Sequence, residues 1–89
     1  MRLSTLLDKE VVTVDGKLVG KIIDVEVDEE WKAKELIVIL KRYVASKLGI
    51  RFSLRPKVAI AVAAVSGVGE YVTLRIGLDD LHFSVTRKL

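Results

Sequence analysis

Residues 11–28 read VVTVDGKLVGKIIDVEVD. We interpret this stretch as a β-hairpin in which a short strand over residues 10–14 and a long strand over residues 17–28 are joined at Asp15-Gly16. An Asp-Gly pair suits a tight turn, because glycine adopts a positive φ without steric cost and aspartate tolerates it better than most residues. The rest of the predicted fold is built outward from this hairpin.

The long strand changes its alternation part-way along. Its apolar residues up to Ile22 share one parity, whereas those from Val25 onward lie on the other. Because successive side chains of a strand point to opposite faces, a flat strand would leave one of these sets in water. A bend or β-bulge near residues 23–24 removes the conflict and predicts a strand that curls into a small barrel. Gly20, inside the same strand, indicates a sharp bend or a closely approaching neighbouring backbone.

The remaining segments predict further strands and one short helix. We expect a helical lead-in over residues 2–9, strands over residues 34–40, 50–54, 57–65 and 70–76, a helix over residues 41–48 that ends at Gly49, and a turn at residues 66–69. The last segment allows a helical turn at residues 79–81 or an edge strand over residues 82–86. The prediction is an all-β fold: a small, strongly bent β-barrel of about six strands with one short helix. Residues 1–76 form the barrel, and residues 77–89 form a C-terminal tail packed on it or extending it.

Length and composition limit the class of protein. The chain has 89 residues, of which 51% are hydrophobic, and it contains no cysteine, asparagine or glutamine. A chain this short buries roughly 60–65% of its unfolded surface, so its high apolar content predicts self-association as a homodimer. The absence of cysteine excludes disulfides and thiolate sites, and the absence of the two amides, with 30% charged residues, predicts a thermophilic source. Without a signal peptide or an apolar run long enough to cross a bilayer, we expect a cytoplasmic protein with no membrane insertion.

The net charge of +3 is unevenly distributed along the chain. Residues 1–35 contain nine acidic and six basic residues, whereas residues 36–69 contain six basic residues and no acidic one. The six are Lys41, Arg42, Lys47, Arg51, Arg55 and Lys57. Three interpretations stay open: contact with the phosphates of RNA or DNA, contact with the acidic region of a second subunit or another protein, and a solvated face.

Two motifs make the chain resemble the PRC-barrel family. Residues 15–25 follow the family's hairpin pattern D-G-x-x-h-G-x-h-x-D-h after a lead-in at residues 3–11, and residues 58–70 resemble its strand, short turn and entry to the last strand. Ala61 stands where many members have proline, and Glu70 stands where aspartate is usual. The resemblance covers residues 3–76 and implies a barrel of about six strands that often pairs.

The family contains docking modules without shared chemistry. It includes the cytoplasmic domain of the photosynthetic reaction centre H subunit, the C-terminal domain of the ribosome maturation factor RimM, and free-standing archaeal and bacterial proteins, among them archaeal cell-division adaptors. The resemblance therefore implies a non-enzymatic protein–protein docking or adaptor module, homodimeric, with a cell-division adaptor as one specific form. The alternative is an RNA- or ribosome-associated factor that uses residues 41–57.

Candidate contact residues lie on two strands and one connection. Residues 36–40, LIVIL, are apolar on both parities, so one face lines the core and the other needs a cover. Residues 57–65 alternate large and small side chains, which suits a close neighbour on the small side. Trp31 in its acidic connection is either an interface hot spot or a ring folded back over a barrel end. The expected partner or dimer contacts are Trp31, Leu36, Ile37, Val38, Ile39, Leu40, Ala59, Ala61 and Ala63, and the hairpin is expected to be scaffold.

The sequence predicts no catalytic residue, no cofactor and no metal. Asp24, Glu26 and Asp28 project from one strand face, a row that can bind a divalent cation, but a solvated face that discourages wrong pairing explains them more simply. His82, the single histidine, lacks a nucleophile or a convergent partner set. A barrel that binds a small ligand in a central cavity is a further interpretation, but so short a barrel is filled by its own side chains.

Overall fold

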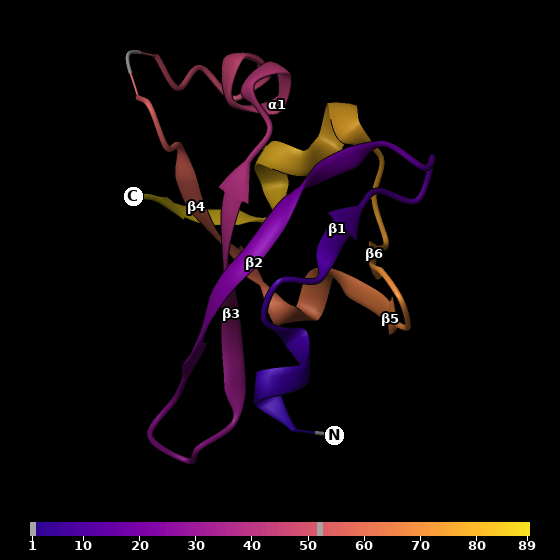
Figure 1. Ribbon diagram of the computed structural model, residues 1–89, viewed down its shortest axis with the longest axis vertical. Coiled ribbons are helices and arrows are strands. Elements are labelled where there is room, and N and C mark those ends of the chain that lie inside the picture. Colours follow the sequence, from indigo (N-terminus) through magenta and orange to yellow (C-terminus); the bar gives the residue numbers. More distant parts are fainter. Residues whose placement is uncertain (1, 52) are drawn as a thin grey trace.

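The computed structural model describes residues 2–51 and 53–89, and it shows a curled sheet with short helical segments (Figure 1). Within the described residues, seven strands form one sheet in the order β5-β6-β1-β2-β3-β4-β7. The strands are β1 (Glu10–Val12), β2 (Leu18–Val27), β3 (Ala33–Leu40), β4 (Lys57–Ala61), β5 (Val65–Val68), β6 (Val72–Leu74) and β7 (Val85–Lys88). Neighbours pair antiparallel except β1 and β6, which are parallel. The all-β barrel fold predicted from the sequence is confirmed, with one strand more than expected.

Four short helical segments accompany the sheet. They are the 3-10 segments η1 (Leu3–Leu6), η2 (Val62–Ala64) and η3 (Leu78–Phe83), and the α-helix α1 (Arg42–Lys47). The lead-in turn and the helix both lie where the sequence predicts them. Gly49 ends the helical region with φ +77°, a value that favours glycine after a helix. Among these described segments, none is a helix of the length and apolar character needed to cross a membrane.

The turn of the hairpin is held by a buried threonine. Gly16 has φ +79° and its N–H donates to the carbonyl of Thr13 at 2.9 Å. Thr13 is 1% exposed, and its hydroxyl accepts the Lys17 N–H at 2.9 Å while donating to the Asp15 carboxylate. That hydroxyl holds the pKa of Asp15 below its ordinary value. The Asp-Gly turn is therefore confirmed, with a side-chain bridge across it.

The β-bulge predicted near residues 23–24 is present. Ile22 pairs with Val38 and the next paired residue, Asp24, pairs with Ile37, so one residue of β2 has no partner. As a result Ile22 is fully buried and Val25 also packs against the core. Both apolar sets of the strand therefore face one interior.

Gly20 lies against a neighbouring backbone, as its position in the strand predicts. A Cβ added at this position would lie 2.0 Å from the carbonyl oxygen of Ile39. No side chain fits at that distance, so the separation of β2 and β3 at this point depends on glycine.

The C-terminal segment forms both elements that the sequence left as alternatives. Residues 79–81 lie inside η3, whose Leu81 is fully buried in the hydrophobic core, and β7 pairs with β4 at the sheet edge. The edge strand starts at Val85, three residues later than the predicted one. Residues beyond 76 thus contribute to the core as well as to the sheet.

The predicted strand over residues 50–54 is wrong in the described residues; Phe52 lies outside them. Both sides of β4 are already paired, with β3 and with β7, so a preceding strand has no edge beside it. The Ile50 N–H instead donates to the carbonyl of Ala45 at 2.9 Å, and Leu54 is 89% exposed. The described residues of this segment lie outside helices and strands, between α1 and β4.

The predicted single strand over residues 57–65 is also wrong, because it breaks at Ala61. The chain turns through η2 and resumes as β5, which lies at the opposite end of the strand order from β4 and β7. The alternation of large and small side chains continues past Ala61 as far as Ala63 and conceals the start of the bend. Residues 66–68, predicted as a turn, therefore belong to β5, and the chain reverses at Gly69, whose N–H donates to the carbonyl of Tyr71 at 2.9 Å.

Candidate docking surface

The sheet has an outer face, formed by β2, β3 and β4 on the side away from the core. Strand register divides the predicted contact residues between the two sides. Leu36, Val38 and Leu40 belong to the core cluster of their own chain, whereas Ile37 and Ile39 take the opposite parity on β3. The core members are therefore not available to a partner while the fold is intact.

Four of the predicted contact residues lie in neighbouring cross-strand rows of the outer face: Ile37, Ile39, Ala59 and Ala61. Ile37 pairs with Ala59, and the next row toward the end of β4 pairs Glu35 with Ala61. Ile37 and Ala59 are buried, at 6% and 0% exposure, but neither belongs to the core cluster. Ile39 and Ala61 are half-buried, whereas Ala63, in η2 beyond the strand, is exposed.

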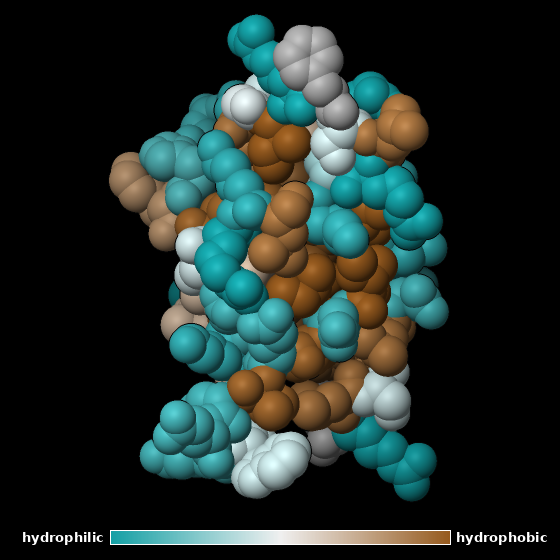
Figure 2. Space-filling model, turned by 90° about the vertical axis from the view of Figure 1, so that its left-hand side faces the viewer, coloured by the Kyte–Doolittle hydropathy of each residue, from teal (hydrophilic) through white to brown (hydrophobic). Residues whose placement is uncertain are grey.

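Figure 2 views the side of the molecule on which β3, β4 and the C-terminus lie in Figure 1. Hydrophobic side chains run down the middle of this face, and hydrophilic ones border them on both sides. An apolar band with charged borders on a sheet face is the pattern of a surface that contacts another molecule.

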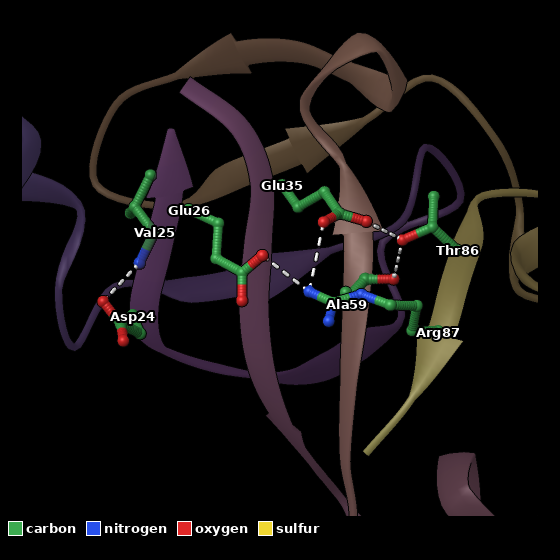
Figure 3. A network of polar contacts seen from close by, with 7 residues as sticks. All are labelled: Asp24, Val25, Glu26, Glu35, Ala59, Thr86 and Arg87. Atoms are coloured by element: carbon green, nitrogen blue, oxygen red, sulfur yellow. Dashed lines mark hydrogen bonds and ion pairs between the residues drawn. The ribbon is translucent and has the colours of Figure 1, made fainter. Parts of the chain in front are cut away.

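One arginine crosses the outer face from the sheet edge (Figure 3). Arg87 lies on β7, and its Nη2 lies 2.6 Å from Glu26 Oε2 on β2 and 3.2 Å from Glu35 Oε1 on β3. Thr86 donates its hydroxyl to Glu35 and lies 3.2 Å from the carbonyl oxygen of Ala59. Since β3 and β4 lie between β7 and β2, the Arg87 side chain passes over the row that contains Ala59.

The surroundings of Glu35, the buried carboxylate of this network, favour its charged form. The Glu35 side chain is 8% exposed, and the Thr86 hydroxyl lowers its pKa below the ordinary value, with a further lowering by the charge of Arg87. A carboxyl whose pKa is lowered in the folded state contributes stability above its unfolded pKa, and it loses that contribution as the pH falls through the folded pKa. The edge strand β7 is thus fastened more firmly at neutral than at acid pH.

A hollow lies at one end of the outer face. Its volume is about 410 Å³, and its lining combines the apolar Ile23, Ile39 and Leu40 with the cationic Lys21, Lys41 and Arg55 and one acid, Asp8. Lys57 on β4 pairs with Ile39 of the hollow and lies beside it. The structure therefore brings three of the six predicted basic residues to the outer face.

The other three basic residues lie around α1. Arg42 and Arg51 are exposed, and Lys47 forms an ion pair of 2.7 Å with Asp79. The basic segment of the sequence is thus not one continuous patch.

The turn between β2 and β3, which we call the tip, projects at the other end of the outer face (Figure 1). Asp28 organises it by accepting the Glu30 and Lys32 N–H groups at 2.8 and 3.0 Å. Trp31 has φ +64° and is 84% exposed. The expectation that its ring folds back over a barrel end is wrong, and an exposed indole in a left-handed backbone conformation is left at the tip.

Asp24, Glu26 and Asp28, the row of acids that could have bound a cation, each interact with another group of the chain. Glu26 pairs with Arg87, Asp24 accepts the N–H of Val25 at 2.8 Å, and Asp28 holds the turn. Across residues 2–51 and 53–89, no three acidic, histidine or cysteine side chains converge as metal ligands would. His82 stacks on the ring of Phe83 with centroids 4.0 Å apart.

Sequence reasoning missed an apolar groove beneath the edge strand β5. It has a volume of about 250 Å³ and is lined by aliphatic side chains, among them Leu3, Leu6, Ala33, Val62, Val65 and Val68. These residues come from four separate segments, so no local pattern in the sequence brings them together. Reasoning from the sequence also missed Lys21 and Ile23 as outer-face residues, although the predicted bulge implied that Ile23 points outward.

Comparison with known proteins identifies the family of this chain. The family model of the PRC-barrel domain matches residues 1–81. No curated protein matches the chain.

Proposed function

Since the chain belongs to the PRC-barrel family, we propose that it is a non-enzymatic docking module that pairs with a second copy of itself and presents a surface to another protein. The observation that carries the proposal is the outer face, where apolar side chains lie on the side of the sheet away from the core. A barrel this small has one core to fill, and it fills that core with Leu36, Val38 and Leu40. Of the two isoleucines of opposite parity, Ile37 is covered by its own chain at 6% exposure, whereas Ile39 is half-buried and leaves apolar surface that favours contact with another chain.

A polar network of the chain itself covers the middle of the outer face. Within the described residues, the groups that reach across the middle of the outer face are the side chains of a polar network, led by Arg87. Interfaces have apolar centres and polar rims, so the apolar surface left for a partner lies beside this network, at the half-buried Ile39 and Ala61. A cell-division adaptor is one specific form of this function.

The experiment is sedimentation of the wild-type chain and of two variants at micromolar concentration. Ile39→Glu places a charge on the outer face between Lys21 and Lys57, whose strands flank it, and we expect it to abolish the dimer while the fold is kept. Val14→Glu is the matched control, since Val14 is 62% exposed outside the strands and its substitution leaves the dimer intact. A wild-type chain that sediments only as a monomer at these concentrations contradicts the proposal of self-pairing.

A second candidate function is RNA contact, and the exposed cations near α1 favour it. Lys41, Arg42, Arg51 and Arg55 are exposed and form no ion pair with the described residues. Binding through phosphates falls steeply with salt, so RNA affinity that drops several orders of magnitude between low and high salt, and that weakens in Lys41→Ala/Arg42→Ala, is the expected result. A pull-down from the source cell with and without nuclease separates this function from protein docking.

A further inference from the structure

We infer that the outer face binds a second copy in antiparallel orientation, with the acidic tip and Trp31 of each chain seated in the basic hollow of the other. This inference rests on the proposed self-pairing and names its geometry. The partner is a second copy of the chain, because one outer face carries both the projecting tip with Trp31 and the hollow that accepts it.

The charge along the outer face changes sign from one end to the other. Lys21, Lys41 and Arg55 outnumber the single acid Asp8 at the hollow. Asp28, Glu29 and Glu30 outnumber Lys32 and Lys34 at the tip, and Ile37 lies between the two ends. A second copy laid parallel would bring like charges together at both ends. A copy related by a two-fold axis pairs acid with base at both ends, which is the self-complementarity an isologous interface requires.

The spacing along the strands fits this axis. Asp24, opposite Ile37, is four residues from Gly20 at the far wall of the hollow and four residues from Asp28 at the start of the tip, and the near wall of the hollow is Ile23, next to Asp24. At about 3.3 Å per residue the two ends each lie about 13 Å from that row. A two-fold axis through the row of Ile37 therefore carries the tip of one chain onto the hollow of the other.

The hairpin cannot dock on its own chain. The tip and the far wall of the hollow are eight residues apart on one strand, about 26 Å, because β2 runs extended from one to the other. The salt bridge that Glu30 forms with Lys32 at the tip is exposed, with both side chains 75% accessible, so it yields to a stronger cationic site at little cost.

The size of the surface limits the contact, and the chemistry of Trp31 strengthens it. The whole side of the molecule seen in Figure 2 measures 34 by 21 Å, so only a contact that covers all of it would approach the ~800 Å² that a standard interface buries on each partner. Tryptophan is the residue most enriched at the energetic centres of interfaces, and an aromatic ring over Lys and Arg adds a cation–π contact. The hollow offers Ile23 and Ile39 to the ring and cations to the carboxylates beside it.

The test uses Trp31, the single tryptophan of the chain, as its own reporter. We expect its fluorescence emission to move to shorter wavelength as nucleic-acid-free protein associates at low salt, in step with dimer formation measured by sedimentation. The tip variant Glu29→Lys/Glu30→Lys and the hollow variant Lys41→Glu/Arg55→Glu each weaken the homodimer by about tenfold or more, because two like-charged contacts form in every dimer. An equimolar mixture of the two variants restores both contacts, and with them the dimer and the emission shift.

Two controls separate docking from general charge and from misfolding. Glu70→Lys/Asp80→Lys makes the same change in net charge as the tip variant at exposed positions elsewhere, and it leaves the dimer unchanged. Trp31→Gly suits the left-handed backbone of the tip, so the variant folds, and its dimer is weakened by roughly 1,000-fold, because two hot-spot contacts of about 30-fold each are lost from every dimer.

Each outcome decides a different statement. A dimer that Ile39→Glu abolishes but the tip and hollow variants leave unchanged, with Trp31 emission constant, supports self-pairing and overturns the antiparallel docking. A mixture of the two variants that associates without a Trp31 shift overturns it too, because net charge alone then explains the attraction. Emission that shifts only when RNA is added identifies a nucleic acid as the occupant of the hollow and also overturns it.

Discussion

The substitution Gly20→Ala tests the contact on which the curled sheet depends. The added Cβ would lie 2.0 Å from the Ile39 carbonyl oxygen, 2.9 Å from its carbonyl carbon and 3.0 Å from the Leu40 Cα. All three atoms belong to the backbone of β3, so no side-chain rotation relieves the overlap. Ordinary contact begins at 3.4 Å, and β2 and β3 must therefore separate locally by about 1.4 Å, from 2.0 to 3.4 Å.

The cost follows from that separation. Forcing extra atoms into a packed site costs about 1–3 kcal/mol. A displacement of this size also breaks one or two neighbouring hydrogen bonds, such as that from the Lys41 N–H to the Val19 carbonyl at 2.9 Å, at about 1 kcal/mol each. We expect Gly20→Ala to lower the free energy of unfolding by roughly 2–5 kcal/mol, a large part of the 5–15 kcal/mol typical of a domain.

Urea unfolding followed by far-UV circular dichroism measures this loss. Trp31 fluorescence is a poor probe of unfolding, because the indole is already 84% exposed in the folded chain. Gly67→Ala is the matched control: a Cβ there meets no atom within 4 Å, and its φ is compatible with alanine. We expect that variant to be unchanged or more stable by up to about 1 kcal/mol. If Gly20→Ala unfolds within about 1 kcal/mol of Gly67→Ala, the close approach of the two strands is refuted.

Three further predictions concern groups that fasten the ends of the sheet. Glu35→Gln destabilises the chain above the ordinary glutamate pKa of 4.5, and the difference from wild type shrinks as the pH falls below it, which urea midpoints measured across that range will show. Thr13→Val leaves the part-buried Lys17 N–H without its side-chain acceptor and lowers the free energy of unfolding by about 1–3 kcal/mol, by chemical denaturation. Leu81→Ala costs about 2–5 kcal/mol by the same assay, whereas Leu54→Ala, at an 89% exposed site, leaves stability nearly unchanged; equal effects would mean that residues beyond 76 do not stabilise the core.

The features that were predicted correctly are those whose causes lie close together in the chain. The Asp15-Gly16 turn, the bulge after Ile22 and the glycine at position 20 each follow from a few consecutive residues and the period of a strand. Helix α1 and its end at Gly49 follow from helical spacing and a residue that adopts positive φ. These local features were sufficient to predict the barrel fold.

The features that were missed depend on residues far apart in the chain. Arg87 reaches Glu35 across 52 positions, and the groove beneath β5 combines residues from 3 to 72. Periodicity also failed where two different structures share one pattern, since the alternation of large and small side chains continues past Ala61 as far as Ala63. Trp31 was exposed rather than folded back because its backbone conformation at the tip directs the chain into a tight reversal, which composition alone does not reveal.

The hairpin that decides the fold is also part of the candidate docking surface, contrary to our expectation that it is scaffold alone. The unpaired residue in β2 lets Ile22 and Val25 both pack inward, and it leaves Ile23 and Asp24 between them without a place in the core cluster. Ile23 then lines the hollow beside Lys21. The bulge therefore curls the sheet around the core and shapes the outer face through the same backbone irregularity. A substitution that removed the bulge would change both at once, so only variants that keep the strand register, such as those at Ile39 and at the tip, can separate docking from folding.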